Sequence, residues 1–171
     1  MNREQMKKRI IEALDTGWYE DCFYCQSGSN FVFGNRAFVV RLRDVDMSKY
    51  QLDKKTVELA EKAFETINDK DREWSGAAIT PPSISLLKKL IQAHANSVLV
   101  LYWFTASLCY NAQIMLPILK LLGNCKMDFR RLPGYSGYGK NRYKTDAWAL
   151  YLVGDRGEAI IMPYAQRQAN D

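Results

Sequence analysis

The chain has 171 residues, enough for one well-filled hydrophobic core, and we expect a single domain spanning residues 1–171. Hydrophobic residues make up 47% and charged residues 25% of the sequence, and no stretch approaches the roughly 18 uninterrupted apolar residues of a membrane span, so we expect a cytoplasmic protein with no membrane partner. Residues 44–73 hold six basic and nine acidic residues, whereas residues 74–171 hold eleven and five. A basic C-terminal portion of this kind is suited to a phosphate backbone, although it also serves solubility.

The N-terminal part of the chain predicts a helix followed by a small antiparallel meander. An amphipathic pattern places the helix over residues 3–14. Strands are predicted over residues 19–28 and 30–43, with a two-residue hairpin signal at Gly34-Asn35 inside the second stretch.

Residues 44–73 predict a charged helical insertion in the domain. Its acidic residues interleave with its lysines, which favours a solvated helical face over a nucleic-acid contact. One side of the predicted helix is apolar: Val57, Ala60, Ala63, Phe64 and Ile67.

A second helix is predicted over residues 84–96, capped by Ser83. Its apolar residues are expected to face the core: Ile84, Leu87, Leu90 and Ile91. Lys88 and Lys89 are expected to face outward.

Residues 98–163 predict one compact unit that organises the rest of the chain. The continuous apolar run at 98–104 is typical of a strand buried on both faces. A short strand, a helix over 111–123 that Asn111 caps and Gly123 ends, and three further strands follow. We therefore expect one continuous antiparallel sheet flanked by that helix, in an α+β domain with packed helices.

Pro117 lies inside the predicted helix over 111–123 and is expected to kink it or to shift its start, because proline lacks the backbone donor.

Metal, redox and catalytic chemistry are all disfavoured by the residue types and their spacing. Only Cys22 and Cys25 have metal-ligand spacing, and in a strand they would point to opposite faces, so we expect free thiols and no metal or other cofactor. The lone histidine, His94, is expected at the surface or at a helix cap, and the aspartates at 44 and 46 as turn formers at a strand end. With no catalytic constellation visible, a non-enzymatic protein is expected.

The strongest functional feature is a glycine- and tyrosine-rich loop expected between two strands near residues 133–146. Its aromatics offer faces for bases, its cations offer phosphate contacts, and its glycines allow close backbone approach. The candidate nucleic-acid residues are Arg130, Arg131, Tyr135, Tyr138, Lys140, Arg142 and Lys144. A hairpin loop made soluble by lysines explains the same composition, and both interpretations stay open.

Two stretches, 107–132 and 147–165, carry a resemblance to the last half-module of a DNA sliding clamp, the ring-forming replication processivity factor. That family shows an Asn-led helix with Leu and Leu-Lys-Leu positions, a strand of alternating residues, and a closing strand that ends in Met-Pro. The matching positions here are Asn111, Leu116, Leu119, Lys120, Leu122, Ile161, Met162 and Pro163. Clamps use several such modules in a ring, so the resemblance implies a homo-oligomer of many copies if this chain forms one.

The resemblance implies a non-enzymatic DNA-replication accessory protein, of a phage or mobile element, that binds nucleic acid through basic residues. In a clamp, lysines and arginines on the helices that line the ring meet phosphates, and the corresponding candidates here are Lys88, Lys89 and Lys120. The alternative is a protein-interaction module or inhibitor, again of a phage or mobile element, whose partner is a host replication or defence protein.

Overall fold

The computed structural model describes residues 23–35, 37–46, 78–106, 108–136 and 143–164, together with helical positions 5, 8, 58, 61, 62, 64 and 65. Most of the predicted helix over 3–14 and most of the charged insertion at 44–73 lie outside these residues. Cys22, Tyr138, Lys140 and Arg142 lie outside them as well.

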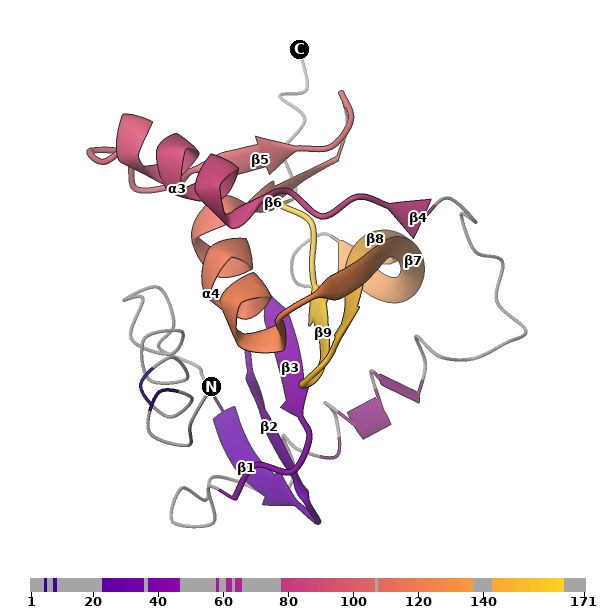
Figure 1. The fold of residues 1–171 in the computed structure, drawn as a ribbon. Helices are drawn as coiled ribbons and strands as arrows, with labels where there is room; N and C mark the ends of the chain where they lie inside the picture. Colours follow the sequence, from indigo (N-terminus) through magenta and orange to yellow (C-terminus); the bar gives the residue numbers. More distant parts are fainter. Residues whose placement is uncertain are drawn as a thin grey trace.

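The described chain is an α+β domain built on an antiparallel sheet, which confirms the expected fold class. Seven strands form the sheet in the order β1-β2-β3-β9-β8-β7-β4, and all neighbouring pairs are antiparallel (Figure 1). The strands are β1 (Phe23–Ser27), β2 (Asn30–Gly34), β3 (Phe38–Leu42), β4 (Ala78–Ile79), β7 (Cys125–Ser136), β8 (Tyr143–Gly154) and β9 (Gly157–Ile161). Two more strands, β5 (Leu101–Trp103) and β6 (Cys109–Asn111), form a separate small sheet.

The predicted meander is confirmed in β1, β2 and β3. Gly28 takes a φ of 59° in the turn between β1 and β2, a conformation that costs glycine little. In the next turn the Asn35 side chain accepts hydrogen bonds from the backbone N–H groups of Ala37 and Phe38, at 2.7 and 3.2 Å. Asn35 therefore supplies locally the acceptor that closes the second hairpin.

The expectation of one continuous sheet across 98–163 is wrong. In the stretch 98–104, only Leu101–Trp103 form a strand, and that strand pairs with β6 and not with the main sheet. Nor is this apolar run buried on both faces, because Val98 is 77% and Trp103 44% exposed. Burial alternates along it instead, with Val100 buried in the core and Tyr102 and Phe104 packed against it. An unbroken apolar run can therefore form a strand that is buried on one side only, and the sequence pattern does not distinguish it from a strand buried on both sides.

One helix, α4 (Ala112–Leu122), lies against the main sheet and contacts β3 and β9, and the second, α3 (Ile84–Ala93), packs on α4 (Figure 1). Both predicted caps are confirmed, since the Ser83 hydroxyl accepts from Leu86 N–H at 3.1 Å and the Asn111 side chain accepts from Gln113 N–H at 2.8 Å. Neither helix is long and apolar enough to cross a membrane.

The ends of the two helices also follow the sequence. Gly123 ends α4 with a φ of 84°, and Pro117 stands inside this helix without shifting its start from Ala112. His94 is the C-cap of α3, and its ring nitrogen Nδ1 lies 3.0 Å from the carbonyl oxygen of Leu90. The expected capping role of the lone histidine is confirmed.

The main core lies between the sheet and α4. Leu87 is the fully buried anchor of α3, while Leu90 and Ile91 pack against the core as expected. Ile84, the first residue of α3, is 39% exposed, contrary to the prediction. The opposite face of the sheet has a smaller cluster in which Phe64, from the charged insertion, is fully buried with Ala149, Tyr151 and Ile160.

Candidate nucleic-acid interface

The hairpin of β7 and β8 is the longest paired element of the molecule. The two strands pair over twelve positions, from Cys125 opposite Gly154 to Ser136 opposite Tyr143. The sequence had predicted a loop from 133 to 146, so this boundary is wrong: strand pairing continues through Pro133 and Gly134. In Figure 1 the two strands curve together away from the rest of the sheet.

Most of this hairpin extends beyond its neighbours in the sheet. β9 pairs with β8 only as far as Leu150, and β4 pairs with β7 only at Met127 and Asp128. Among the described residues, the seven pairs from Arg130–Ala149 to Ser136–Tyr143 therefore have no third strand beside them. At about 3.3 Å per residue they form a two-stranded ribbon roughly 20 Å in contour length. We call these seven pairs the ribbon.

An aromatic cluster fixes the base of the ribbon to the small sheet. The Phe129 ring stacks on Tyr110 at a centroid distance of 6.1 Å, and the Phe104 ring meets both edge-on at 5.5 and 5.7 Å. The Tyr110 hydroxyl donates to the carbonyl oxygen of Trp148 at 2.5 Å. Trp148 lies two residues beyond Leu150, where the pairing of β8 with β9 ends. The ribbon therefore starts from a rigid base, although a free two-stranded ribbon is itself only marginally stable.

Burial sets the ionisation of that tyrosine. It raises the pKa of Tyr110 well above the usual value near 10, and the neighbouring Cys109 thiol acts in the same direction. Tyr110 therefore remains a neutral hydrogen-bond donor at ordinary pH.

Arg130, one of the predicted phosphate contacts, is held by its own strand. Its Nε and Nη2 atoms donate to the two carboxylate oxygens of Asp128 at 3.0 and 3.2 Å, and its guanidinium lies 3.7 Å from the centroid of the Tyr151 ring. An arginine bound by a carboxylate fork and an aromatic face has little charge left to offer a phosphate.

Arg131 lies on the other side of the strand. It is exposed, and its guanidinium lies 5.7 Å from the centroid of the Trp148 ring, directly opposite in the register. Trp148 is half-buried and does not belong to either hydrophobic cluster. The two predicted arginines are thus separated by the strand, and Arg131 forms a cation–aromatic pair at the base of the ribbon.

The remaining hairpin residues can be placed only by register. Tyr135 stands opposite Lys144, four positions further along each strand than the Arg131–Trp148 pair. Tyr138, Lys140 and Arg142 are not among the described residues.

The lysines on the helices lie apart from the ribbon. Lys88 and Lys89 are exposed on α3, as predicted. Lys120 is half-buried in the last turn of α4, where a cation is favoured by the helix dipole, and its carbonyl oxygen accepts from Arg156 at 3.3 Å. Among the described residues, the predicted cations therefore belong to different elements: Lys88 and Lys89 to α3, Lys120 to α4, and Arg130, Arg131 and Lys144 to the β7–β8 hairpin.

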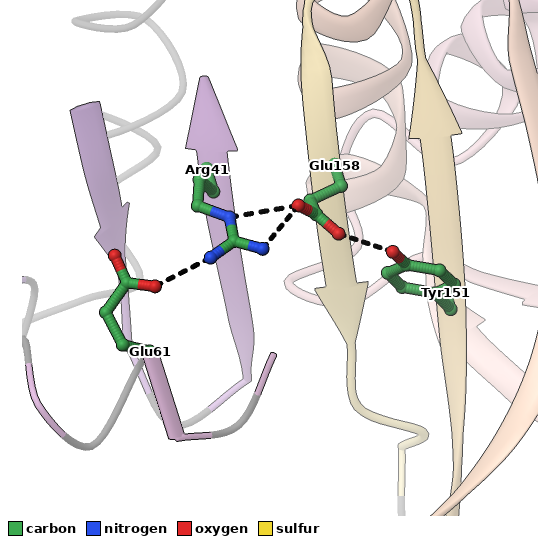
Figure 2. A network of polar contacts seen from close by, with 4 residues as sticks. All are labelled: Arg41, Glu61, Tyr151 and Glu158. Atoms are coloured by element: carbon green, nitrogen blue, oxygen red, sulfur yellow. Dashed lines mark hydrogen bonds and ion pairs between the residues drawn. The ribbon is translucent and has the colours of Figure 1, made fainter. Parts of the chain in front are cut away.

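A polar network crosses the sheet face opposite α4 (Figure 2). Arg41 on β3 donates to Glu158 Oε1 on β9 from Nε at 2.9 Å and from Nη2 at 2.6 Å. Its Nη1 donates to Glu61 Oε2 at 2.7 Å, and the Tyr151 hydroxyl donates to Glu158 Oε2. Burial would lower the pKa of Arg41, but the two carboxylates outweigh it and the pKa is raised, so the guanidinium stays charged.

This network joins the sheet to the charged insertion. Arg41 also lies 4.4 Å from the centroid of the buried Phe64 ring, next to Glu61 in the insertion. Glu158 is buried, and each of its carboxylate oxygens has a donor. Satisfied buried charges of this kind are typical of a structural network, and the sequence could not show it because its members are far apart along the chain.

The thiols whose environment the structure describes are not activated. Burial raises the pKa of Cys109, and burial together with Asp155 raises the pKa of Cys125 to about 11. Both thiols are free, and no cluster of metal-ligating side chains occurs among the described residues. The Asp44 backbone has a φ of 53° at the bend after β3, as a turn-forming aspartate adopts.

Comparisons of the chain with protein-family models, with curated proteins and with solved structures each find no match. The function must therefore be argued from the ribbon, the helical lysines and the motifs of the sequence.

Proposed function

We propose that this chain is a non-enzymatic DNA-binding accessory protein of replication, with sliding-clamp-like character, of the kind that phages and mobile elements use. The observation that carries the proposal is the ribbon. A two-stranded extension with an anchored base bears an exposed arginine, and the sequence that connects its strands contains Tyr138, Lys140 and Arg142. Such an element offers positive charge at the end of a rigid support, which suits a phosphate backbone.

The motifs of the closing helix and strand support the clamp-like part of the proposal. The Asn-led α4, its Lys120 and the final Met162-Pro163 are the positions that resemble a clamp half-module. The exposed Lys88 and Lys89 on the neighbouring helix would then meet phosphates without reading sequence. A ring would need several copies of a chain of this length, so the proposal includes a homo-oligomer.

The test is DNA binding measured by fluorescence anisotropy at roughly 50 and 200 mM salt, together with the solution mass. On duplex DNA, log affinity should fall against log salt with a slope of roughly −0.9 per phosphate contact. Neutralising Lys140, Arg142 and Lys144 in the hairpin variant K140Q/R142Q/K144Q should make the slope less steep by up to about 2.7 if the hairpin provides those contacts. The variant K88Q/K89Q tests the helical surface in the same way.

A matched control removes three exposed lysines that lie outside both the ribbon and α3, in the variant K8Q/K62Q/K126Q. It loses the same charge as the hairpin variant K140Q/R142Q/K144Q, so a similar loss of affinity would mean that only net charge matters. If the parent chain binds no DNA at low salt, the proposal fails.

A protein-interaction module or inhibitor, acting on a host replication or defence protein, is the second candidate. It is favoured by apolar side chains that the described surface leaves exposed: Leu86 at 47%, Trp103 at 44% and Val98 at 77%. Large exposed apolar residues are typical of protein contacts. A defined complex with one purified protein partner, in the absence of any salt-dependent DNA affinity, would establish this function in place of the first.

A further inference from the structure

We infer that the ribbon binds single-stranded nucleic acid, with Trp148 and Arg131 as a stacking platform for an unpaired base. The inference rests on the proposed function and specifies the ligand of one of its two basic regions. Its ligand is defined by chemistry: exposed bases on a phosphodiester backbone.

The first argument is the position of Trp148. Its backbone carbonyl is fixed by the Tyr110 hydroxyl at 2.5 Å, so the residue has a defined place at the base of the ribbon. Its ring belongs to neither hydrophobic cluster, and its neighbour across the strands is an exposed arginine 5.7 Å from the ring centroid. A partly accessible indole beside a guanidinium provides two flat surfaces on which a base can stack.

The second argument is the spacing of the next pair. Tyr135 and Lys144 stand opposite each other four positions beyond Arg131 and Trp148, and residues four apart in a strand share a face. At about 3.3 Å per residue the two pairs are separated by roughly 13 Å, or about two to four nucleotides of an extended strand. By register, an aromatic residue and a cation therefore stand opposite each other at both of these positions.

The third argument is the amount of charge. Between residues 130 and 148 the chain has five cations and one acid, Asp146, and the Arg130 guanidinium is already bound by Asp128. Five cations are fewer than the roughly 6–10 phosphate contacts of a strongly salt-dependent duplex binder. The same stretch holds three tyrosines and a tryptophan, whose ring faces find no exposed base to stack on in an intact duplex but would each stabilise a stacked unpaired base by about five- to 150-fold.

The experiment measures anisotropy with three labelled probes of about 20 nucleotides, oligo-dT, oligo-rU and a DNA duplex, a length that exceeds the roughly 4–16 nucleotides one module covers. The full chain should bind at least one single strand more tightly than the duplex. Whichever of oligo-dT and oligo-rU binds more tightly shows whether the preferred ligand contains deoxyribose or ribose. Trp148→Ala should weaken that binding by about five- to 150-fold, and Trp148→Phe, which keeps an aromatic face, by less.

Trp103→Ala is the matched control, because Trp103 is exposed on β5 and outside the ribbon. It should leave affinity unchanged. Arg131→Lys keeps the charge and loses the planar stack, so it should weaken the single-strand complex while leaving the salt slope as it is. Intrinsic tryptophan fluorescence gives a second readout, since a stacked base should quench Trp148 and the quenching should disappear in Trp148→Phe.

Unchanged single-strand affinity in Trp148→Ala, an equal loss in Trp103→Ala, or a preference for duplex DNA overturns this inference. In the case of a duplex preference the proposed DNA-binding function survives, with the phosphate contacts supplied by Lys88 and Lys89 or by Lys140, Arg142 and Lys144. If none of the probes binds, both conclusions fail together.

Discussion

The network in Figure 2 makes a quantitative prediction about what holds the charged insertion and β9 to β3. Glu158→Ala removes three hydrogen bonds, two from Arg41 and one from Tyr151. Hydrogen bonds to charged groups contribute about 1.5–3 kcal/mol each, so the gross loss is large. Arg41 keeps Glu61 and its side chain is 23% exposed, so water and the second carboxylate offset part of it. We expect the free energy of unfolding to fall by about 2–4 kcal/mol.

A double-mutant cycle separates the pair from its surroundings. The coupling energy between Arg41→Ala and Glu158→Ala should be about 1–3 kcal/mol, because the Glu158 side chain is only 11% exposed. The matched control is the cycle between Arg41→Ala and Glu61→Ala, whose acid is 26% exposed, and it should give less than about 1 kcal/mol. Both are measured by urea unfolding with unchanged m-values. Equal coupling in the two cycles would refute the argument that burial decides the strength of these pairs.

Two further predictions concern the groups whose pKa values are shifted. Tyr110→Phe should lower the free energy of unfolding by about 1–2 kcal/mol, because it removes the donor to the Trp148 carbonyl. It should also flatten the dependence of that free energy on pH above about pH 10. Because the pKa of Tyr110 is raised in the folded state, its contribution to stability in the parent is full below the unfolded pKa of 10.0 and is lost as the pH rises toward the folded pKa. A steeper or equal alkaline decline in the variant contradicts this. In a C22S/C25S/C109A background, which leaves Cys125 as the single thiol of the sequence, Cys125 should react with a disulfide reagent at pH 8 about tenfold more slowly than an unfolded thiol. A pKa raised from 9.0 to about 11 lowers the thiolate population about 100-fold, while the higher basicity of the thiolate restores about tenfold of the rate. An unfolded-like rate would show that the thiol is exposed.

Local chemistry made several elements predictable from the sequence. Ser83, Asn111 and Gly123 mark helix ends because their own side chains or φ angles satisfy the backbone there. Asn35 and Gly28 mark turns for the same reason. Each of these signals acts within a few residues, so a single sequence contains it.

Tertiary pairing was not predictable in the same way. The run at 98–104 is as apolar as a central strand, yet its strand β5 joins the small sheet by pairing with β6. The run itself does not specify the partner strand, and the partner decides which sheet a strand joins. The continuation of β7 past Pro133 and Gly134 was missed because both residues usually end strands. With no third strand beside β7 at Pro133 among the described residues, the missing proline donor costs the sheet nothing on that side.

The Arg130-Arg131 dipeptide shows how strand geometry divides a sequence motif into two roles. Consecutive residues in a strand face opposite sides, so the two guanidinium groups cannot act on one phosphate surface once this stretch is β-structure. On one side Asp128, Arg130, Tyr151, Glu158 and Arg41 form an alternating chain of charges and rings across β7, β8, β9 and β3. On the other side Arg131 lies against the ring of Trp148, the residue opposite it in the register. The first arginine stabilises the sheet from which the ribbon extends, and the second gives that ribbon its aromatic and basic face.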